Sequence, residues 1–212
     1  MTALVIIARA PELGRVKTRL AATLGAERTL GIYRQLLVRT AAVAAAWPGP
    51  VLVAATGDGS WAGTGLDALP RIPQADGGLG RRIHGALAAG LARAPRAIAI
   101  GSDCPALDVP ALAAVDAALA DHAAAFGPAV DGGFWAVGVA DAAAAAALGD
   151  DALPWSTERT RTACRERLAT CGLTSADAGP VLDDCDDEAA WRAAVAAGWL
   201  SGIHPSGDQS PC

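Results

Sequence analysis

The sequence predicts an α/β fold with a mostly parallel sheet and helices on both of its faces. Short apolar runs rich in β-branched residues alternate with longer segments of helical periodicity. Strands that are apolar throughout are buried on both sides, so the helices between them must cover both faces of the sheet. The predicted strands are Ala3–Ala8, Val51–Ala55, Ala97–Gly101 and Phe134–Val139.

Helices are predicted where apolar side chains recur three and four residues apart and so share one helical face. Pro110 falls in the first turn of one of them, where a backbone N–H has no partner within the helix, so its absence costs no hydrogen bond. The predicted helices are Ala26–Ala46, Leu79–Arg93, Val109–Asp121, Arg159–Cys171 and Asp187–Ala197. Residues 1–200 are expected to form a single domain, and residues 201–212, which have lost all periodicity, a loose C-terminal tail.

Composition and charge exclude several classes of protein. Of 212 residues, 52% are hydrophobic and 18% charged, which is enough apolar material for a core. The net charge of −5 provides no basic surface for a nucleic acid polymer. No apolar run approaches the roughly 20 residues of a membrane span, and no signal segment is recognisable, so we expect a cytoplasmic protein. Alanine-rich helices at Asp141–Leu148 and Ala189–Ala197 leave a homodimer open.

Ligands of parallel sheets bind beyond the carboxyl ends of the strands, and the loop after the first predicted strand is strongly cationic. Residues 9–19 contain four cations, among them Lys17, the only lysine of the chain. Their natural partner is a polyanion such as the phosphates of a nucleotide. We therefore predict that Gly14, Arg15, Lys17 and Arg19 bind a nucleotide and that Lys17 is also catalytic. The alternative is a solvated charged loop.

A second loop, rich in glycine, opens the predicted helix at residue 79. Glycine allows the backbone to approach a ligand closely, and a helix N-terminus favours anions. Gln74, Gly80 and Arg82 are therefore further candidates for nucleotide binding. The spacing of these glycines does not match a dinucleotide-binding fingerprint, and the cationic loop at residues 9–19 does not have the pattern of a P-loop. A plain loop-to-helix turn explains the segment equally well.

Carboxylates occur in three later segments. Asp103 stands directly after the third predicted strand, where it could bind Mg²⁺ or Mn²⁺ together with phosphate oxygens, or could simply cap a turn. The run 183–188 holds five acids in six residues, more than a helix start requires, and either Asp184 or Asp186 could be the second metal ligand. Asp131 lies at a glycine-rich bend and could face an acceptor, or belong to a hairpin turn.

These motifs, taken in order, resemble the radical-SAM/selenodomain-associated transferase family, whose members are usually labelled glycosyltransferases. The resemblance spans about residues 3–192. More distantly, the sequence is similar to the guanylyltransferases of molybdenum-cofactor and 2-phospholactate metabolism. The motifs are PELGRVKTRL at residues 11–20, QADGGLGRR at 74–82, GSDCP at 101–105, GPAVDGG at 127–133, WST at 155–157 and DCD at 184–186.

The resemblance implies a GT-A, nucleotide-diphospho-sugar transferase-like fold. It implies that Arg15, Lys17 and Arg19 cradle phosphates and that Asp103 and Asp184 hold Mg²⁺ or Mn²⁺. Apart from the resemblance, Asp103 and Asp131 are predicted to be catalytic together with Lys17, with Asp131 facing the acceptor. The remaining acceptor-binding candidates are Gly132, Gly133, Trp155, Ser156 and Thr157.

The candidate loops contain no pattern for a covalent nucleophile, so the chemistry expected is transfer by positioning and charge neutralisation. The first hypothesis is nucleotidyl transfer from an NTP to a small phosphorylated or hydroxylated acceptor, with release of pyrophosphate. The alternative is a glycosyltransferase with a nucleotide-sugar donor. A third hypothesis is a nucleotide-binding module without turnover.

Overall fold

The computed structural model describes residues 1–202, so most of the predicted C-terminal tail lies outside the described residues. The strands are β1 (Thr2–Arg9), β2 (Val51–Thr56), β3 (Arg71–Pro73), β4 (Arg96–Ile100), β5 (Ala124–Pro128), β6 (Phe134–Val139) and β7 (Ser175–Asp177). The helices are α1 (Thr18–Leu24), α2 (Ala26–Ala45), α3 (Leu79–Leu91), α4 (Val109–Ala118), α5 (Ala142–Ala147), α6 (Thr160–Thr170) and α7 (Glu188–Ala196).

The described strands form one seven-stranded sheet in the order β3-β2-β1-β4-β6-β5-β7. β6 runs antiparallel to both of its neighbours, β4 and β5, and the other four pairings are parallel. The predicted mostly parallel α/β sheet is therefore confirmed. Because β6 is reversed, its first residue, Phe134, lies at the same edge of the sheet as the last residues of β1 and β4.

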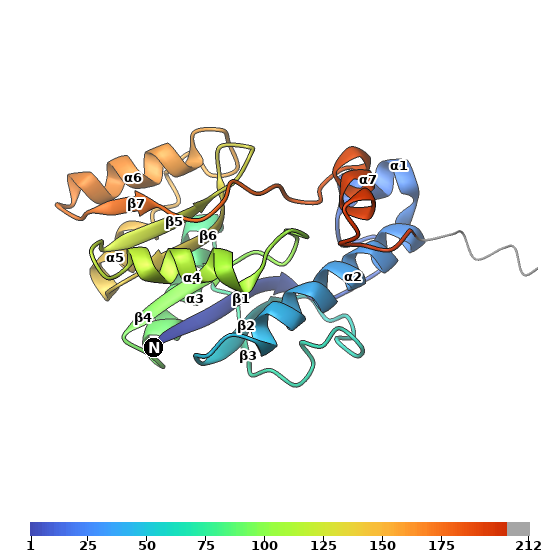
Figure 1. Ribbon diagram of the computed structural model, residues 1–212, viewed down its shortest axis with the longest axis horizontal. Coiled ribbons are helices and arrows are strands. Elements are labelled where there is room, and N and C mark those ends of the chain that lie inside the picture. Colours follow the sequence, from blue (N-terminus) through green and yellow to red (C-terminus); the bar gives the residue numbers. More distant parts are fainter. Residues whose placement is uncertain (203–212) are drawn as a thin grey trace, which may run out of the picture.

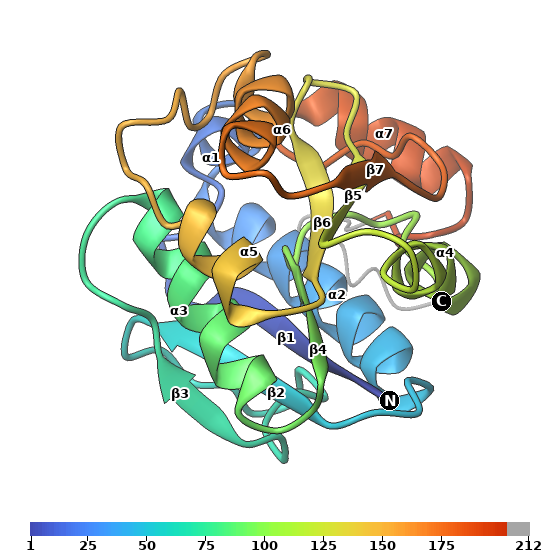
Figure 2. The ribbon, with the colours of Figure 1, turned by 90° about the vertical axis from the view of Figure 1, so that its left-hand side faces the viewer.

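Helices cover both faces of the sheet, as predicted (Figure 1). Leu4 and Ile6 of β1 point into a core that α1, α2, α4 and α7 complete, whereas Val5 points into a second core with α3, α5 and α6. The alternation along β1 follows from the two-residue period of a strand. Figure 2 shows α3 and α5 in front of the sheet. α5 thus packs on the sheet, with Ala144 and Ala145 buried.

The structure adds elements that periodicity did not show. β3 and β7 have three residues each, too few to display a period of two. β5 reads AAFGP and lacks β-branched residues, which hides it among the alanines. α1 begins inside the cationic segment, directly after Lys17, where the sequence suggested only a loop. No helix among residues 1–202 is long and apolar enough to cross a bilayer.

Candidate active site at the carboxyl ends of the strands

The cationic loop after β1 ends in a constrained residue. Lys17 adopts the left-handed conformation, with φ 44°, and directly precedes α1. A non-glycine residue rarely holds this backbone conformation, and such strained residues cluster at functional sites. Gly14, earlier in the loop, has a φ of 71°. Glycine adopts this positive φ without steric cost, so the geometry of the turn accounts for a glycine at this position.

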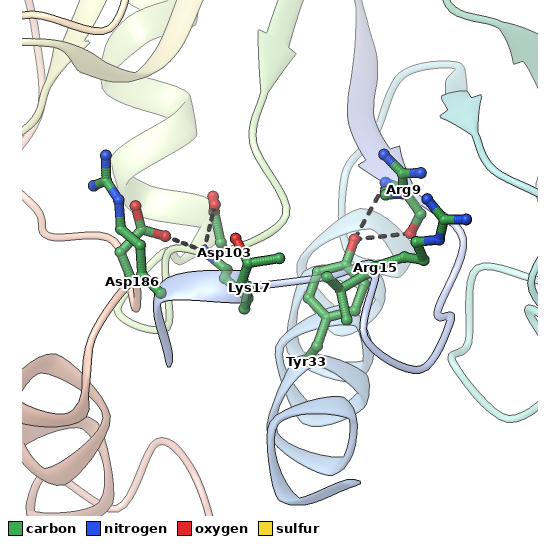
Figure 3. A pocket seen from close by; sticks show the side chains of 9 residues that line it. Arg9, Arg15, Lys17, Tyr33, Asp103 and Asp186 are labelled. Carbon is green, nitrogen blue, oxygen red and sulfur yellow. Dashed lines mark hydrogen bonds and ion pairs between the residues drawn. The ribbon is translucent and has the colours of Figure 1, made fainter. Parts of the chain in front are cut away.

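The side chain of Lys17 is buried between two carboxylates (Figure 3). Its Nζ donates to Oδ2 of Asp103 at 2.7 Å and to Oδ1 of Asp186 at 2.5 Å, and only 8% of the side chain is exposed. Burial alone would lower the pKa of Lys17, but the two carboxylates outweigh it and raise that pKa above its ordinary value. The ammonium is therefore charged at neutral pH.

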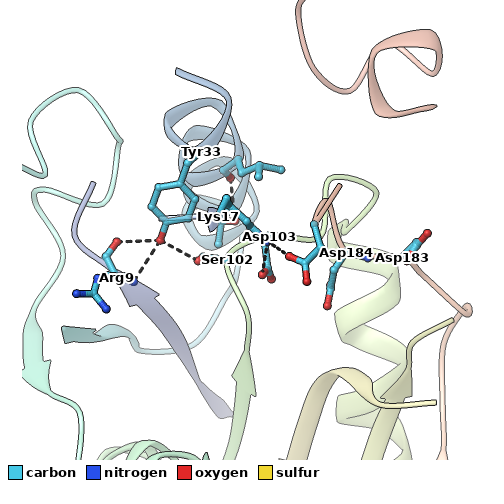
Figure 4. A network of polar contacts seen from close by, with 10 residues as sticks. Arg9, Lys17, Tyr33, Ser102, Asp103, Asp183 and Asp184 are labelled. Carbon is cyan, nitrogen blue, oxygen red and sulfur yellow. Dashed lines mark hydrogen bonds and ion pairs between the residues drawn. The ribbon is translucent and has the colours of Figure 1, made fainter. Parts of the chain in front are cut away.

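Tyr33 of α2 fixes the start of the same loop. Its hydroxyl donates to the carbonyl of Arg9 at 2.8 Å and accepts from the Arg9 N–H at 3.2 Å. Ser102 Oγ lies 3.5 Å away on the other side (Figure 4). The pKa of Tyr33 is raised, chiefly by burial, which keeps the hydroxyl protonated as a donor. Sequence reasoning did not single out Tyr33 and so missed this contact.

Backbone pairing brings the acidic segment beside Asp103. Leu182 runs parallel to the end of β5 and exchanges hydrogen bonds with Pro128 and Val130. The N–H of Cys185 then donates to the carbonyl of Asp103 at 2.9 Å. Asp184 is thereby held next to Asp103, as Figure 4 shows. No side-chain pattern in the sequence encodes these main-chain bonds.

The neighbouring carboxylates affect the pKa of Asp184. This pKa is raised to about 8, chiefly by burial and also by repulsion from Asp103, while the charge of Lys17 opposes the rise. Asp186 and Asp131 contribute in the same direction as Asp103. A site with more carboxylates than cations is one in which a further cation would relieve repulsion.

Three cavities meet at Asp103. The cationic cavity, about 310 Å³, is lined by Arg9, Arg15, Val16, Lys17, Thr18, Arg19, Tyr33, Asp103 and Asp186. The acidic cavity, about 380 Å³, is lined by Arg19, Leu79, Asp103, Asp131, Gly133, Phe134, Trp155, Ser156, Thr160, Asp184 and Asp186. The third, about 420 Å³, lies over the strand ends and is called the sheet-edge cavity. Most predicted site residues thus converge on one place.

The sheet-edge cavity is bounded by the ends of β1, β2 and β4 and by the first turns of α3. Gln74 and Arg82, two of the predicted nucleotide ligands, line it. The side-chain amide nitrogen of Gln74 donates hydrogen bonds to the carbonyls of Ala8, at 3.2 Å, and Ala54, at 2.9 Å. With that nitrogen engaged, Gln74 can offer a ligand an acceptor oxygen.

The glycine-rich turn before α3 is filled by the protein's own side chains. The carboxylate of Asp151 accepts from the N–H groups of Gly78 and Arg81, at 3.0 and 3.1 Å. The hydrogen bonds from Arg81 and Gly78 lower the pKa of Asp151. A side chain on Gly80 would come within 2.9 Å of the indole nitrogen of Trp155, so close packing explains this glycine.

The predicted acceptor residues divide into two groups. Asp131, Gly133, Trp155 and Ser156 line the acidic cavity. Asp131 lies in the turn between β5 and β6, the hairpin considered as its alternative role, and its Oδ1 accepts from Gly133 N–H at 2.8 Å.

The other group has structural contacts. Gly132 packs against the backbone of Glu158. The hydroxyl of Thr157 donates to the carbonyl of Pro154 at 2.8 Å. Thr160, which sequence reasoning passed over, lines the acidic cavity in its place.

The oxygen donors around Asp103 suit a hard divalent cation. Within residues 1–202, no group of three or more histidine, cysteine or acidic side chains forms a ready metal centre. Asp103 and Asp184 are two carboxylates on one cavity wall, and Mg²⁺ is commonly bound by one or two carboxylates with phosphate oxygens and water completing its shell. The donor set therefore fits the predicted ion.

Comparison with known proteins identifies the family. Residues 37–157, more than half of the chain, match the family described as "Uncharacterized protein conserved in bacteria (DUF2064)", and the chain belongs to this family. No curated protein matches the sequence significantly.

Three solved structures share the fold of this chain. A protein of Desulfovibrio desulfuricans G20, described as a "putative nucleotide-diphospho-sugar transferase", superposes with a TM-score of 0.76 at 21% identity over 88% of this chain and 84% of its own. The 2-C-methyl-D-erythritol 4-phosphate cytidylyltransferase of Thermus thermophilus gives 0.54 at 16% identity, over 94% and 100%. CMP:2-keto-3-deoxy-manno-octonic acid synthetase, complexed with CTP, gives 0.54 at 14%, over 94% and 100%. The fold predicted from the motifs is confirmed.

Proposed function

We propose that this member of the DUF2064 family is a metal-dependent transferase that uses a nucleotide, and that its reaction is nucleotidyl transfer from an NTP. The observation that carries the proposal is the position of Lys17. A buried, charged ammonium, flanked in its cavity by Arg15 and Arg19, faces the carboxylate of Asp103 at the strand ends. Such a concentration of cations suits a triphosphate whose pyrophosphate must be held as it leaves.

The three cavities supply the parts of this reaction. The sheet-edge cavity, mostly apolar with Gln74 and Arg82 on its wall, is suited to the nucleoside. The cationic cavity is suited to the β- and γ-phosphates. The acidic cavity would take a small phosphorylated or hydroxylated acceptor, beside Asp131. Asp103 belongs to all three cavities, so the α-phosphate would lie near it.

In the proposed step an acceptor oxygen attacks the α-phosphorus, and the bond from that phosphorus to the oxygen bridging it to the β-phosphorus breaks. Pyrophosphate leaves with the bonding electrons, and Lys17 and Arg15 balance its charge. Where the acceptor is a hydroxyl, Asp131 accepts its proton. Asp103 and Asp184 would hold Mg²⁺ or Mn²⁺, which when bound neutralises phosphate charge.

A second candidate is glycosyl transfer from a nucleotide sugar. It is favoured by the fold match to the Desulfovibrio protein, which has the highest TM-score of the three structures compared above. The same cationic cavity would then hold a leaving nucleoside diphosphate, and Asp131 would take the proton of an acceptor hydroxyl. The two reactions differ in the donor that binds and in the leaving group, so they are separable by experiment.

The test is calorimetric titration of the protein with ATP, GTP, CTP, UTP and the common UDP- and GDP-sugars, each with Mg²⁺ and with Mn²⁺. Nucleotidyl transfer predicts that one NTP binds more tightly than any nucleotide sugar and releases pyrophosphate on turnover. The reverse preference, with release of nucleoside diphosphate, would establish the second candidate instead. Binding without any turnover would indicate a nucleotide-binding module. No binding in either set would overturn the proposal.

A further inference from the structure

The carboxylate of Asp151 occupies the N-terminus of α3. It accepts hydrogen bonds from the main-chain N–H of Gly78 and of Arg81, and it pairs with Nε of Arg81 at 3.2 Å. Asp151 comes from the loop after α5, about seventy residues further along the chain. An anion at this position is favoured by the free N–H groups and the dipole of the helix. Here the protein supplies that anion itself.

The glycines of the turn are what allow this approach. A Cβ on Gly78 would lie 2.6 Å from Oδ1 of Asp151, and a Cβ on Gly80 would lie 2.9 Å from the carbonyl oxygen of Asp150. Neither distance is compatible with a side chain unless the loop moves away. The turn before α3 is therefore shaped to receive the segment that begins at Asp150.

The same segment continues into the wall of the acidic cavity. The indole N–H of Trp155 donates to the carbonyl of Asp150 at 2.9 Å, and the Trp155 ring meets Phe134 edge-on, with centroids 6.3 Å apart. Trp155, Ser156, Phe134 and Leu79 all line the acidic cavity. Hydrogen bonds at the adjacent residues Asp150 and Asp151 thus tie the start of α3 to Trp155 in the wall of the acidic cavity.

We propose that Asp151 is a positioning residue that fastens the loop of residues 149–157, the acceptor loop, to α3 and so holds Trp155 and Ser156 in the wall of the acidic cavity. The assignment of that cavity to an acceptor rests on the proposed function, whereas the fastening itself does not. Leu79 lines both the acidic and the sheet-edge cavity, so the fastening also joins the two walls through α3.

The experiment compares Asp151→Ala with a matched control, Asp141→Ala. Asp141 also accepts a main-chain N–H at a helix start, from Ala144 at 2.8 Å, but it follows the last residue of β6 and so lies at the opposite edge of the sheet. Both variants lose a capping carboxylate. Hydrogen exchange of residues 149–157 and near-ultraviolet circular dichroism of the Trp155–Phe134 pair are measured on the full chain.

We expect Asp151→Ala to speed exchange in the acceptor loop several-fold and to weaken the near-ultraviolet signal. Asp141→Ala should change neither. Asp151→Asn keeps one acceptor oxygen and should restore part of both readouts.

The outcomes separate the two proposals. Unchanged exchange and an unchanged near-ultraviolet signal in Asp151→Ala overturn the fastening role, whatever the protein binds. Equal changes in Asp151→Ala and Asp141→Ala also overturn it, because they reveal general destabilisation only. Failure of the unmodified protein to bind any nucleotide overturns the proposed function, and the exchange and dichroism data then still decide on Asp151.

Discussion

The Nζ atom of Lys17 lies 2.7 Å from Oδ2 of Asp103, so the residue proposed to hold phosphates is paired with the residue proposed to hold a metal. In the ligand-free chain each compensates the charge of the other. Asp186, 2.5 Å from the same ammonium, completes the pairing. Binding of a metal–nucleotide complex would give each group a new partner of the appropriate sign, without leaving a buried charge unpaired.

Lys17→Met tests the cationic side of this arrangement. Methionine keeps the apolar stem but removes the charge, so affinity for the preferred nucleotide should fall by about 1.5–3 kcal/mol, the range for a hydrogen bond to a charged group. Calorimetric titration measures it. The matched control is Arg15→Met. The Arg15 side chain is 67% exposed, so its charge should matter less because solvent screens it. Equal losses in both variants would contradict a special role for Lys17.

Asp184→Asn and Asp186→Asn separate the two candidates for the second metal ligand. Asp184 is partly buried beside Asp103, whereas Asp186 is half exposed and already bonded to Lys17. We expect Asp184→Asn to abolish the enhancement of nucleotide binding by Mn²⁺ and Asp186→Asn to reduce it only weakly. Titration with and without EDTA measures this enhancement. The opposite ranking would assign the ligand to Asp186.

The raised pKa of Asp184 predicts a pH dependence of stability in the metal-free protein. A carboxyl with a pKa of about 8 when folded, against an ordinary value near 4 when unfolded, binds more protons in the folded state between these values. Stability should therefore fall as the pH rises through this window. Asp184→Asn, which does not titrate, should lose that contribution. Urea unfolding in EDTA at several pH values measures the difference, and parallel curves for the two proteins would contradict the prediction.

Much of the fold was predictable because its signals are local. The apolar runs of β1, β2, β4 and β6 and the periodicity of the long helices appear within short windows of sequence. The loops after β1 and β4 could be assigned to the site because parallel strands end at a common edge. What could not be predicted depends on long-range contacts. The hydrogen bond from Cys185 to Asp103 joins residues 82 positions apart through main-chain atoms, which have the same chemistry in every residue.

The glycines before α3 show the same limit. Glycine allows a close approach, but the sequence does not say whether a ligand or another part of the chain approaches. In the structure it is the loop containing Asp151. Tyr33 carried a signal that was overlooked. It is the only tyrosine of the chain, as Lys17 is the only lysine, and both line the cationic cavity.

Tyr33→Phe tests whether that hydroxyl matters. The change leaves the partly buried N–H and carbonyl of Arg9 without their partner, so the free energy of unfolding should fall by about 1–3 kcal/mol. Because Arg9 is where the cationic loop begins, nucleotide affinity should fall as well. Thr40→Val is the matched control, since it removes another buried hydroxyl of α2, which bonds only to Leu36 within the helix. Urea denaturation and calorimetric titration compare the two variants. If Thr40→Val lowers nucleotide affinity as much as Tyr33→Phe, the effect comes from the stability of α2 and not from the loop at Arg9.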